Sequence, residues 1–436
     1  MADFARSQSA AVQAQLDRLA KLSPGGDRLG LDRIGRLLEA LGRPQDRLAP
    51  VFHVAGTNGK GSTCAFLRAM LEAAGLKVHM FTSPHLVRFN ERIRIGGKLI
   101  EDEQLAVLLA EVLDAGAGIE ASFFEVTTAV AFLAFARQRA DACVIEVGLG
   151  GRLDATNILE NPLVCGIAGL GIDHRQWLGT RVSDIAGEKA AIAKHGVPLV
   201  TLRYPQRAAQ RVRQVADAAG APLIARGGSW DCRAIRGQLR YRDGFGRLDL
   251  PLPGLEGRHQ ADNAALAVAM LRHQRLLQIP EQALAAGIRD ARWPARLQQL
   301  GPGALFGLLP EGSELWIDGG HNASAARQIA YHVRRDWADD LPLVLLFASL
   351  QSKDPKAMLR PFASIAPEVH ALPIADHDDR PPEELVALAT GMGLRATVNH
   401  SLEEALRRVD APARVLVFGS LYLAGEALAA NGQEPD

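Results

Sequence analysis

The stretch His53-Val54-Ala55-Gly56-Thr57-Asn58-Gly59-Lys60-Gly61-Ser62-Thr63 lies between a short apolar segment and an alanine- and leucine-rich segment with helical periodicity. Its small residues allow backbone N–H groups to approach an anion, and the N-terminus of the following helix adds the positive end of a dipole. Lys60 supplies a charge for the β- and γ-phosphates of a nucleotide. The pattern therefore predicts a loop that binds a nucleoside triphosphate.

This loop is a variant of the usual phosphate-binding pattern. Val54 stands five positions before Gly59, where a glycine is usual, and Gly61 separates Lys60 from Ser62. A glycine-rich turn with one exposed lysine is the alternative interpretation. The order of strand, loop and helix favours phosphate binding.

Length and composition indicate an enzyme of at least two domains. The chain has 436 residues, more than one ordinary core accommodates. Lys plus Arg and Asp plus Glu both total 49, so no nucleic-acid partner is expected. Residues 1–22 mix charges into a helical pattern, and no apolar stretch is long enough for a membrane span, so neither a signal peptide nor a membrane role is expected. The scattered cysteines, Cys64, Cys143, Cys165 and Cys232, are interpreted as reduced residues of a cytoplasmic protein.

Strand-like apolar segments alternate with helical patterns, which predicts parallel βαβ units and an α/β fold. A first, doubly wound sheet is expected from strands at 50–55, 77–82, 142–147, 163–169 and 198–202. Residues 230–252 predict a small antiparallel insert. A second series is expected at 314–318, 343–348, 369–372, 395–398 and 414–418. The boundary is placed between domains 1–295 and 296–436, with a site in the cleft between them.

Further chemical signals follow the first-domain strands. An apolar strand ends at Glu146, whose carboxylate could hold Mg²⁺, an ion that prefers oxygen ligands. Pairing at a strand edge is the alternative. Asp173-His174 follows the next strand, where a lone histidine is more often structural. Lys189, among small and apolar residues, would by itself be interpreted as a solvated helix lysine.

Together these motifs resemble those of the folylpolyglutamate synthase and dihydrofolate synthase family of the Mur ligase superfamily. The resemblance covers nearly the whole chain and is carried by residues 29–33, 55–63, 82–93, 123–125, 146–157, 172–174, 186–189, 263–266, 293–297 and 318–322. It implies a Mur-ligase-like fold, in which a doubly wound P-loop ATPase domain is followed by a smaller Rossmann-like α/β domain.

The resemblance implies an ATP-dependent carboxylate–amine ligase. ATP would phosphorylate a substrate carboxylate, and the amine of L-glutamate would attack the acyl phosphate to form an amide. Dihydropteroate would give dihydrofolate, and reduced folates would give folylpolyglutamates. The segments 83–86 and 150–154 look most like bacterial bifunctional members. A monofunctional synthase is the nearer alternative, and an ATP-dependent binding or switch protein without ligase activity is the more distant one.

The resemblance also implies roles for individual residues. ATP would be bound by Asn58, Gly59, Lys60, Gly61, Ser62, Asn263, Arg296 and Asp318; Mg²⁺ by Ser83, Glu146 and His174; the pterin by Gly30, Leu31, Phe124, Glu125, Asp154 and Ala155; and glutamate by His321 and Ser420. Lys60, Glu146, His174 and Lys189 form the implied catalytic group. Two Mg²⁺ ions and a monomer are implied, and a monovalent cation is left open.

Several of these roles have competing interpretations. Lys189 matches a position that is carbamylated in the family, which requires a neutral amine; apolar neighbours favour this state and Glu188 opposes it. Phe124 could pack in the core, and Ser420 could be a helix N-cap. A capping role is equally open for His321. The chain departs from the family pattern at Ala295, Gly320 and Ala323, and no role is assigned to residues 301–312.

Overall fold

The computed structural model describes residues 6–22, 29–337 and 341–435. The chain divides into two compact units, Met1–Gly254 with His259–Arg292 and Leu255–Arg258 with Trp293–Asp436. The break after Arg292 lies beside the proline-containing segment at which the sequence predicts a boundary. The assignment of substrates to the two domains stays a prediction.

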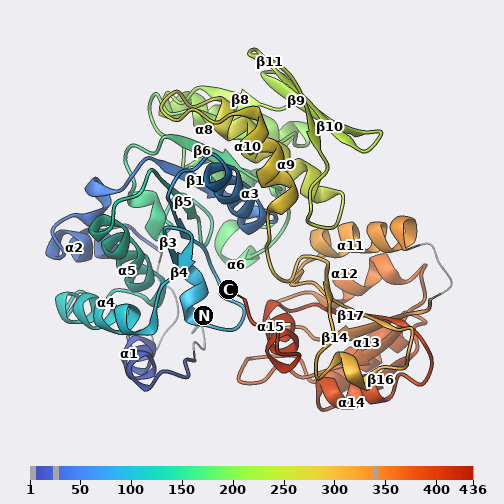
Figure 1. The fold of residues 1–436 in the computed structure, drawn as a ribbon. Helices are drawn as coiled ribbons and strands as arrows, with labels where there is room; N and C mark the ends of the chain where they lie inside the picture. Colours follow the sequence, from blue (N-terminus) through green and yellow to red (C-terminus); the bar gives the residue numbers. More distant parts are fainter. Residues whose placement is uncertain (1–5, 23–28, 338–340, 436) are drawn as a thin grey trace. The chain divides into compact units, whose positions relative to one another are not determined.

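An eight-stranded, mostly parallel sheet forms the centre of the described part of the first unit (Figure 1). Its strands are β1 (Val51–Ala55), β2 (Val78–Phe81), β3 (Ile93–Ile95), β4 (Lys98–Leu99), β5 (Ala142–Glu146), β6 (Val164–Ile167), β7 (Leu199–Thr201) and β8 (Leu223–Ala225). The order is β4-β3-β2-β5-β1-β6-β7-β8, with β3 and β4 antiparallel to their neighbours. Strands β3, β4 and β8 were not among the predicted strands.

Helices cover both faces of this sheet, which confirms the doubly wound α/β fold. Gly166 of β6 faces Met270 of α9 (His259–Arg272), on the side that also carries α3 (Lys60–Ala73) and α10 (Glu281–Asp290) (Figure 1). Cys143 and Ile145 of β5 point to the other face, into a core shared with α5 (Phe123–Arg137). The remaining helices of the unit are α1 (Ala10–Ala20), α2 (Asp32–Ala40), α4 (Asp102–Ala115), α6 (Arg175–Leu178), α7 (Val182–Ala190), α8 (Gln206–Ala219), and the 3₁₀ turns η1 (Pro44–Arg47), η2 (Phe89–Arg92) and η3 (Ala155–Ile158).

A small antiparallel sheet occupies the region in which the sequence predicts an antiparallel insert. Strands β9 (Trp230–Ile235), β10 (Gln238–Asp243) and β11 (Gly246–Pro251) pair in the order β11-β10-β9. Trp230 and Tyr241 are buried on one face, with their ring centroids 5.8 Å apart. Because side chains alternate along a strand, the opposite face carries the polar residues between them.

The second unit contains a six-stranded sheet in its described residues. Its strands are β12 (Gln298–Leu300), β13 (Glu314–Ile317), β14 (Leu343–Phe347), β15 (Glu368–Ala371), β16 (Ala396–Val398) and β17 (Arg414–Phe418), in the order β12-β13-β17-β14-β15-β16. All neighbours are parallel except β12 and β13. The helices are α11 (Ala323–Asp336), α12 (Pro355–Leu359), α13 (Pro382–Thr390), α14 (Leu402–Arg407) and α15 (Leu421–Ala430), with 3₁₀ turns η4 (Phe306–Leu308) and η5 (Arg360–Phe362).

The segment 301–312, to which the sequence assigns no role, is a connection held by hydrogen bonds to Asn431. The side-chain oxygen of Asn431 accepts hydrogen bonds from the backbone of Leu305 at 3.1 Å and Phe306 at 3.0 Å. Its amide nitrogen donates to the carbonyl of Gly301 at 3.1 Å. One buried side chain thus anchors this connection to the end of α15.

None of the helices within the described ranges has the length and apolarity that crossing a membrane requires.

Candidate functional site

The loop between β1 and α3 is held in one conformation by backbone contacts. Gly59 has a φ of 83°, and a Cβ atom there would lie 2.3 Å from Oδ1 of Asn263, so the position requires glycine. The N–H groups of Thr57 and Asn58 donate to the carbonyl of Gly169, at 2.8 and 3.1 Å. The first N–H groups of a helix have no partner within the helix, so the start of α3 is suited to an anion.

Ser62, in the first turn of α3, supports the same interpretation. Its side chain is 1% exposed, and within the described residues its Oγ has no hydrogen-bond partner. Buried hydroxyl groups are normally hydrogen-bonded, so an exception calls for a bound group. A phosphate oxygen or a metal ion would satisfy this hydroxyl.

Three residues that the sequence selects lie together at the carboxyl ends of neighbouring strands. Nζ of Lys60 is 3.8 Å from Oε1 of Glu146, the last residue of β5. The N–H of Ser83, which follows β2, donates to Oε2 of Glu146 at 3.2 Å. Glu146 is 4% exposed, and buried carboxylates are rare without partners such as these.

The oxygen atoms of this group suit a hard cation. Glu146 and Ser83 present a carboxylate and a hydroxyl, and Mg²⁺ binds oxygen ligands while keeping several waters. No three or more His, Cys, Asp or Glu side chains gather into a metal-holding group anywhere in residues 6–22, 29–337 and 341–435. His174 is the N-cap residue of α6, with a φ of 49°, and its place among the ligands stays a prediction.

Lys189 is buried in α7 and is 4% exposed. Burial, aided by the charge of Lys60, lowers the pKa of Lys189 to about 7, although Asp173, Asp154 and Glu188 act in the opposite direction. The carboxylate of Glu188 also pairs with Arg152, whose Nε lies 3.0 Å from Oε1. A large share of Lys189 is therefore neutral near pH 7, and a neutral amine is a nucleophile.

Gly151 explains how α7 comes close to the strand ends. A Cβ atom at this position would lie 2.5 Å from the carbonyl oxygen of Glu188 and 3.0 Å from Cα of Lys189. The neighbouring N–H of Arg152 donates to that same carbonyl at 3.0 Å. The glycine-rich turn after β5 thus places the backbone of α7, and with it Lys189, beside Asp154 and the phosphate loop.

The predicted pterin-binding residues lie around the start of α5. The ring of Phe124 packs over Gly148, where a Cβ atom would lie 2.4 Å from the ring, and its centroid is 6.0 Å from that of Phe81. Phe124 is only half-buried, so part of the ring is accessible. Gly30 and Leu31 are also half-buried, just before α2, and Ala155 is buried at the start of η3. Their contact with a pterin stays a prediction.

The two predicted pterin-binding carboxylates already have partners inside the protein. Oε2 of Glu125 accepts hydrogen bonds from the N–H of Ser122 at 2.7 Å and from Nε of Arg33 at 3.0 Å. The carboxylate of Asp154 accepts from the N–H of Leu149 at 2.8 Å and from that of Thr156 at 3.0 Å. Burial raises the pKa of Asp154, which these donors partly offset. Both side chains thus have a structural role at a helix start.

Two contacts of predicted site residues were missed from the sequence. Nδ2 of Asn263 donates to Oε1 of Gln260 at 2.9 Å, and within the described residues Nε2 of this buried Gln260 has no partner. The i,i+3 spacing on one helix was the available signal. Arg33 likewise contacts Glu125. The capping-box pattern from Ser122 to Glu125 was a signal that this carboxylate bonds within the protein.

Asp318 and Arg296 are the residues of the second unit that are predicted to contact ATP. Oδ2 of Asp318 accepts from the N–H of Leu297 at 2.9 Å and Oδ1 from that of Gly320 at 2.7 Å. Burial raises the pKa of Asp318, and the charge of Arg296 lowers it. Nη1 of Arg296 donates to the carbonyl of Ala295 at 2.7 Å.

His321 and Ser420 follow the neighbouring strands β13 and β17 of the same unit. The loops that carry them meet where the N–H of Gly419 donates to the carbonyl of Gly320 at 3.2 Å. Nδ1 of His321 is 3.0 Å from the carbonyl oxygen of Gly319. Ser420 is the N-cap of α15, with its Oγ accepting from the N–H of Tyr422 at 3.2 Å. Glutamate binding by either residue stays a prediction.

Two departures from the family pattern have visible structural consequences. Ala295 has a φ of 53°, the left-handed conformation that favours the glycine common at this position. A Cβ atom at Gly320, where alanine is common, would lie 2.8 Å from Oδ1 of Asp318. Both affect loop geometry, and neither removes a charged group.

Comparisons with known proteins agree with these observations. Residues 308–430 match the family model of the dihydrofolate synthetase C-terminal domain. The chain is 35% identical over 360 residues to a dihydrofolate synthase/folylpolyglutamate synthase of Bacillus subtilis, covering 79% of this chain and 81% of that protein.

Solved structures are similar over almost the whole chain. Escherichia coli FolC in complex with DHPP and ADP has a TM-score of 0.85 at 30% identity, covering 95% of this chain and 97% of that one. A bifunctional folylpolyglutamate synthase/dihydrofolate synthase with Mn, AMPPNP and L-glutamate bound has a TM-score of 0.84 at 29% identity, covering 97% and 99%.

Proposed function

Because the chain belongs to the family of dihydrofolate synthases and folylpolyglutamate synthases, we propose that it is an ATP-dependent ligase that adds L-glutamate to dihydropteroate and to reduced folates. The family membership makes the chain a ligase of this type. The observation that carries the proposed mechanism is the group of Lys60, Glu146 and Ser83 beside the phosphate loop.

The first step is the transfer of the γ-phosphoryl group. An oxygen of the substrate carboxylate attacks the γ-phosphorus, the bond to the β-phosphate breaks, and ADP leaves. The start of α3 and Lys60 hold the triphosphate, while Ser83 and Glu146, with His174, would hold Mg²⁺. Such a metal neutralises charge on the phosphate oxygens, which dominates phosphoryl transfer.

In the second step, the amine of glutamate attacks the acyl carbon, inorganic phosphate leaves, and the amine loses a proton. The acyl phosphate must be kept from water until the amine arrives. His321 and Ser420 would bind glutamate, and Arg296 and Asp318 would contact ATP. Asn263, against Gly59, would lie near the base.

Lys189 is proposed to be carbamylated. Its neutral amine would attack CO₂ and lose a proton, which replaces a cation by an anion able to help hold the metal. Two observations support this proposal: Lys189 is buried, and Gly151 allows the backbone of α7 at Glu188 and Lys189 to lie close to the turn after β5. Lys60 would then face an anion instead of a like charge.

The remaining proposals concern the metal count, the oligomeric state and the compartment. Two Mg²⁺ ions and a monomer follow from the resemblance to the family, and a requirement for a monovalent cation is an open test. The four cysteines are all buried and unpaired, which favours a reducing compartment such as the cytoplasm. Equal numbers of acidic and basic residues give no overall attraction to nucleic acid.

The proposed function is tested by ADP release from purified protein with ATP, Mg²⁺ and glutamate. Dihydropteroate and a reduced folate monoglutamate are compared as acceptors, and each product is identified by its mass. Glutamate-dependent turnover of both acceptors is expected. Turnover of one alone would reveal a monofunctional synthase, and glutamate-independent hydrolysis or no turnover would contradict the ligase assignment.

A further inference from the structure

The outer face of the three-stranded insert carries an unusual concentration of arginines. The strand register places Arg242 opposite both Asp231 and Arg247, and Arg240 opposite both Arg233 and Asp249. Residues that are directly opposite in a sheet share a face. Four arginines and two aspartates therefore occupy one face, while Trp230, Cys232, Tyr241 and Leu250 are buried on the other.

Two of these cross-strand pairs join like charges. Arg233 faces Arg240, and Arg242 faces Arg247. Like charges directly opposite each other destabilise a sheet. Such an arrangement is unfavourable in the free protein, and a bound anion would relieve it.

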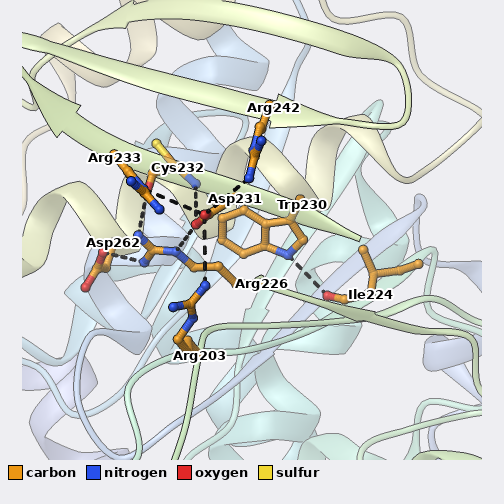
Figure 2. Close-up of polar contacts among 9 residues, drawn as sticks. All are labelled: Arg203, Ile224, Arg226, Trp230, Asp231, Cys232, Arg233, Arg242 and Asp262. Atoms are coloured by element: carbon orange, nitrogen blue, oxygen red, sulfur yellow. Dashed lines mark hydrogen bonds and ion pairs between the residues drawn. The ribbon is translucent and has the colours of Figure 1, made fainter. Parts of the chain in front are cut away.

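A fifth arginine joins this face from outside the insert. Arg203, in the loop after β7, converges with Arg233 and Arg242 on Oδ2 of Asp231 (Figure 2). The three nitrogen-to-oxygen distances are 3.9, 3.9 and 4.0 Å. Charge-assisted hydrogen bonds are about 2.7–2.9 Å long, so Asp231 attracts these guanidinium groups at longer range.

The exposure of the charged groups shows that the guanidinium groups face solvent. The side chains of Arg203, Arg233 and Arg242 are 66%, 71% and 66% exposed, whereas that of Asp231 is 11% exposed. Their donors are therefore accessible to a molecule from solution. One buried carboxylate beneath three exposed guanidinium groups leaves a positive surface in a chain whose formal net charge is zero.

Arg226 differs from the other three and acts as a support. Its side chain is 17% exposed, and its Nη1 is 2.6 Å from Oδ1 of Asp262, so its charge is paired. It also lies 3.3 Å from Oδ1 of Asp231 and stacks on Trp230 (Figure 2). Arg226 thus fixes Asp231 at the centre of the cluster.

We propose that Arg203, Arg233 and Arg242, here named the arginine face, bind an anion that carries at least two phosphate or carboxylate groups. The planar guanidinium fork binds both kinds of group through two parallel hydrogen bonds. Diagonal neighbours in a sheet are roughly 7–8 Å apart, so a chain of anionic groups can contact several arginines. The ligand is a phosphate chain or a γ-glutamyl carboxylate chain, and the latter source rests on the proposed function.

The test measures binding to the full-length protein by calorimetry, with the nucleotide site filled by AMPPNP and Mg²⁺. Inorganic tripolyphosphate and tetra-γ-glutamate are the two probes. Arg233→Gln with Arg242→Gln is expected to weaken binding at least tenfold. The matched control, Arg395→Gln with Arg407→Gln, removes two exposed arginines of the second unit and should change binding less than twofold.

A second variant tests whether the guanidinium fork contributes beyond its charge, and the melting temperature tests whether the substitutions disturb folding. Arg233→Lys with Arg242→Lys keeps both charges but lacks the forks, so it is expected to bind more weakly than the native protein and more tightly than the glutamine variant. Removing the like-charge pairs should leave the melting temperature of the glutamine variant unchanged or raise it. Binding should also weaken as salt is added.

The probes distinguish the ligand sources. Binding of tripolyphosphate alone identifies phosphate, and binding of tetra-γ-glutamate alone identifies the carboxylate chain. Equal affinity in the native protein and the glutamine variant would overturn the proposal, as would binding of neither probe. Because no turnover is measured, failure here is distinct from failure of the ligase assay.

Discussion

At the scale of single residues, the site depends on charges held in largely buried positions. Lys60 and Glu146 neutralise each other at 3.8 Å, and Lys189 is buried with its pKa lowered to about 7. Ser62 adds a buried hydroxyl group without a hydrogen-bond partner in the described residues. Burying a lysine and a hydroxyl group without a partner is costly in the free protein, and a bound phosphate would offset that cost.

Lys60 is expected to act on the reaction more than on stability. Lys60→Ala should lower kcat/KM for ATP by about 10²–10³-fold, because it removes a charge aimed at the developing phosphate charge. The matched control is Lys98→Ala on the exposed edge strand β4, which should leave kcat/KM within twofold. Similar kinetics for the two variants, with similar melting temperatures, would exclude this role for Lys60.

The carbamate on Lys189 should form more readily as pH rises. With its pKa lowered to about 7, Lys189 is about one-tenth neutral at pH 6 and about nine-tenths neutral at pH 8. Incubation with ¹³C-bicarbonate should therefore give a carbamate resonance that grows over this range. Lys189→Ala should abolish the resonance, and Lys194→Ala should keep it. A resonance that survives in Lys189→Ala would place the modification elsewhere.

The lowered pKa of Lys189 also makes the free energy of unfolding of the unmodified protein depend on pH. In the unfolded chain, lysine titrates near about 10.4. Between pH 7 and that value the unfolded state binds more protons, so the free energy of unfolding rises with pH by up to about 1.4 kcal/mol per unit. In the absence of CO₂, this pH dependence should be weaker in Lys189→Met.

At the scale of elements, the turn between β5 and η3 determines how closely α7 approaches the strand ends. Gly151→Ala would place a methyl group 2.5 Å from the carbonyl oxygen of Glu188, so α7 must move. We expect a loss of about 1–3 kcal/mol in the free energy of unfolding and loss of the carbamate resonance.

Gly244→Ala is the matched control for Gly151→Ala. A Cβ atom at Gly244 would meet no atom within 4 Å, so stability and the resonance should be unchanged. Urea denaturation with the same NMR measurement provides both readouts. Equal stability of the two variants would show that α7 does not depend on this close approach.

The elements that the sequence predicts correctly are those with strong local patterns. The long apolar strands β1, β5, β14 and β17 are buried on both faces and read as continuous apolar segments. Strands β3, β4 and β8 span only two or three residues, and β12 (Gln298–Leu300) is polar. Their pairing is decided by neighbours distant in sequence, which a local pattern does not contain.

The candidate site shows the same division. The position of Lys60 and Glu146 at strand ends follows from the βαβ pattern, since the carboxyl ends of parallel strands meet at one edge. The contacts of Asp154 and Glu125 with nearby backbone N–H groups depend on exact turn geometry. The approach of Asn263 to Gly59 depends on how α9 packs against the phosphate loop, which the local pattern of either segment does not contain.

At the scale of the whole molecule, each unit has a core and a sheet of its own, and the proposed ATP contacts come from both. A ligand that binds only the folded state stabilises it by mass action, by about 2.7 kcal/mol at one hundred times its Kd. AMPPNP with Mg²⁺ should therefore raise the melting temperature of this 436-residue chain by roughly 3–5 °C. L-Glutamate alone should cause a smaller shift, and Lys60→Ala should reduce the AMPPNP shift. An equal AMPPNP shift in both proteins would contradict binding through Lys60.

The most direct measurement follows oxygen from the substrate carboxylate into phosphate. Dihydropteroate labelled with ¹⁸O in both carboxylate oxygens is incubated with the enzyme, ATP, Mg²⁺ and L-glutamate, and the released phosphate is analysed by mass. If the carboxylate attacks ATP and glutamate displaces the phosphate, each amide formed leaves one ¹⁸O atom in one phosphate. Unlabelled phosphate accumulating with ADP would mean that water attacks ATP, which contradicts ligation through an acyl phosphate.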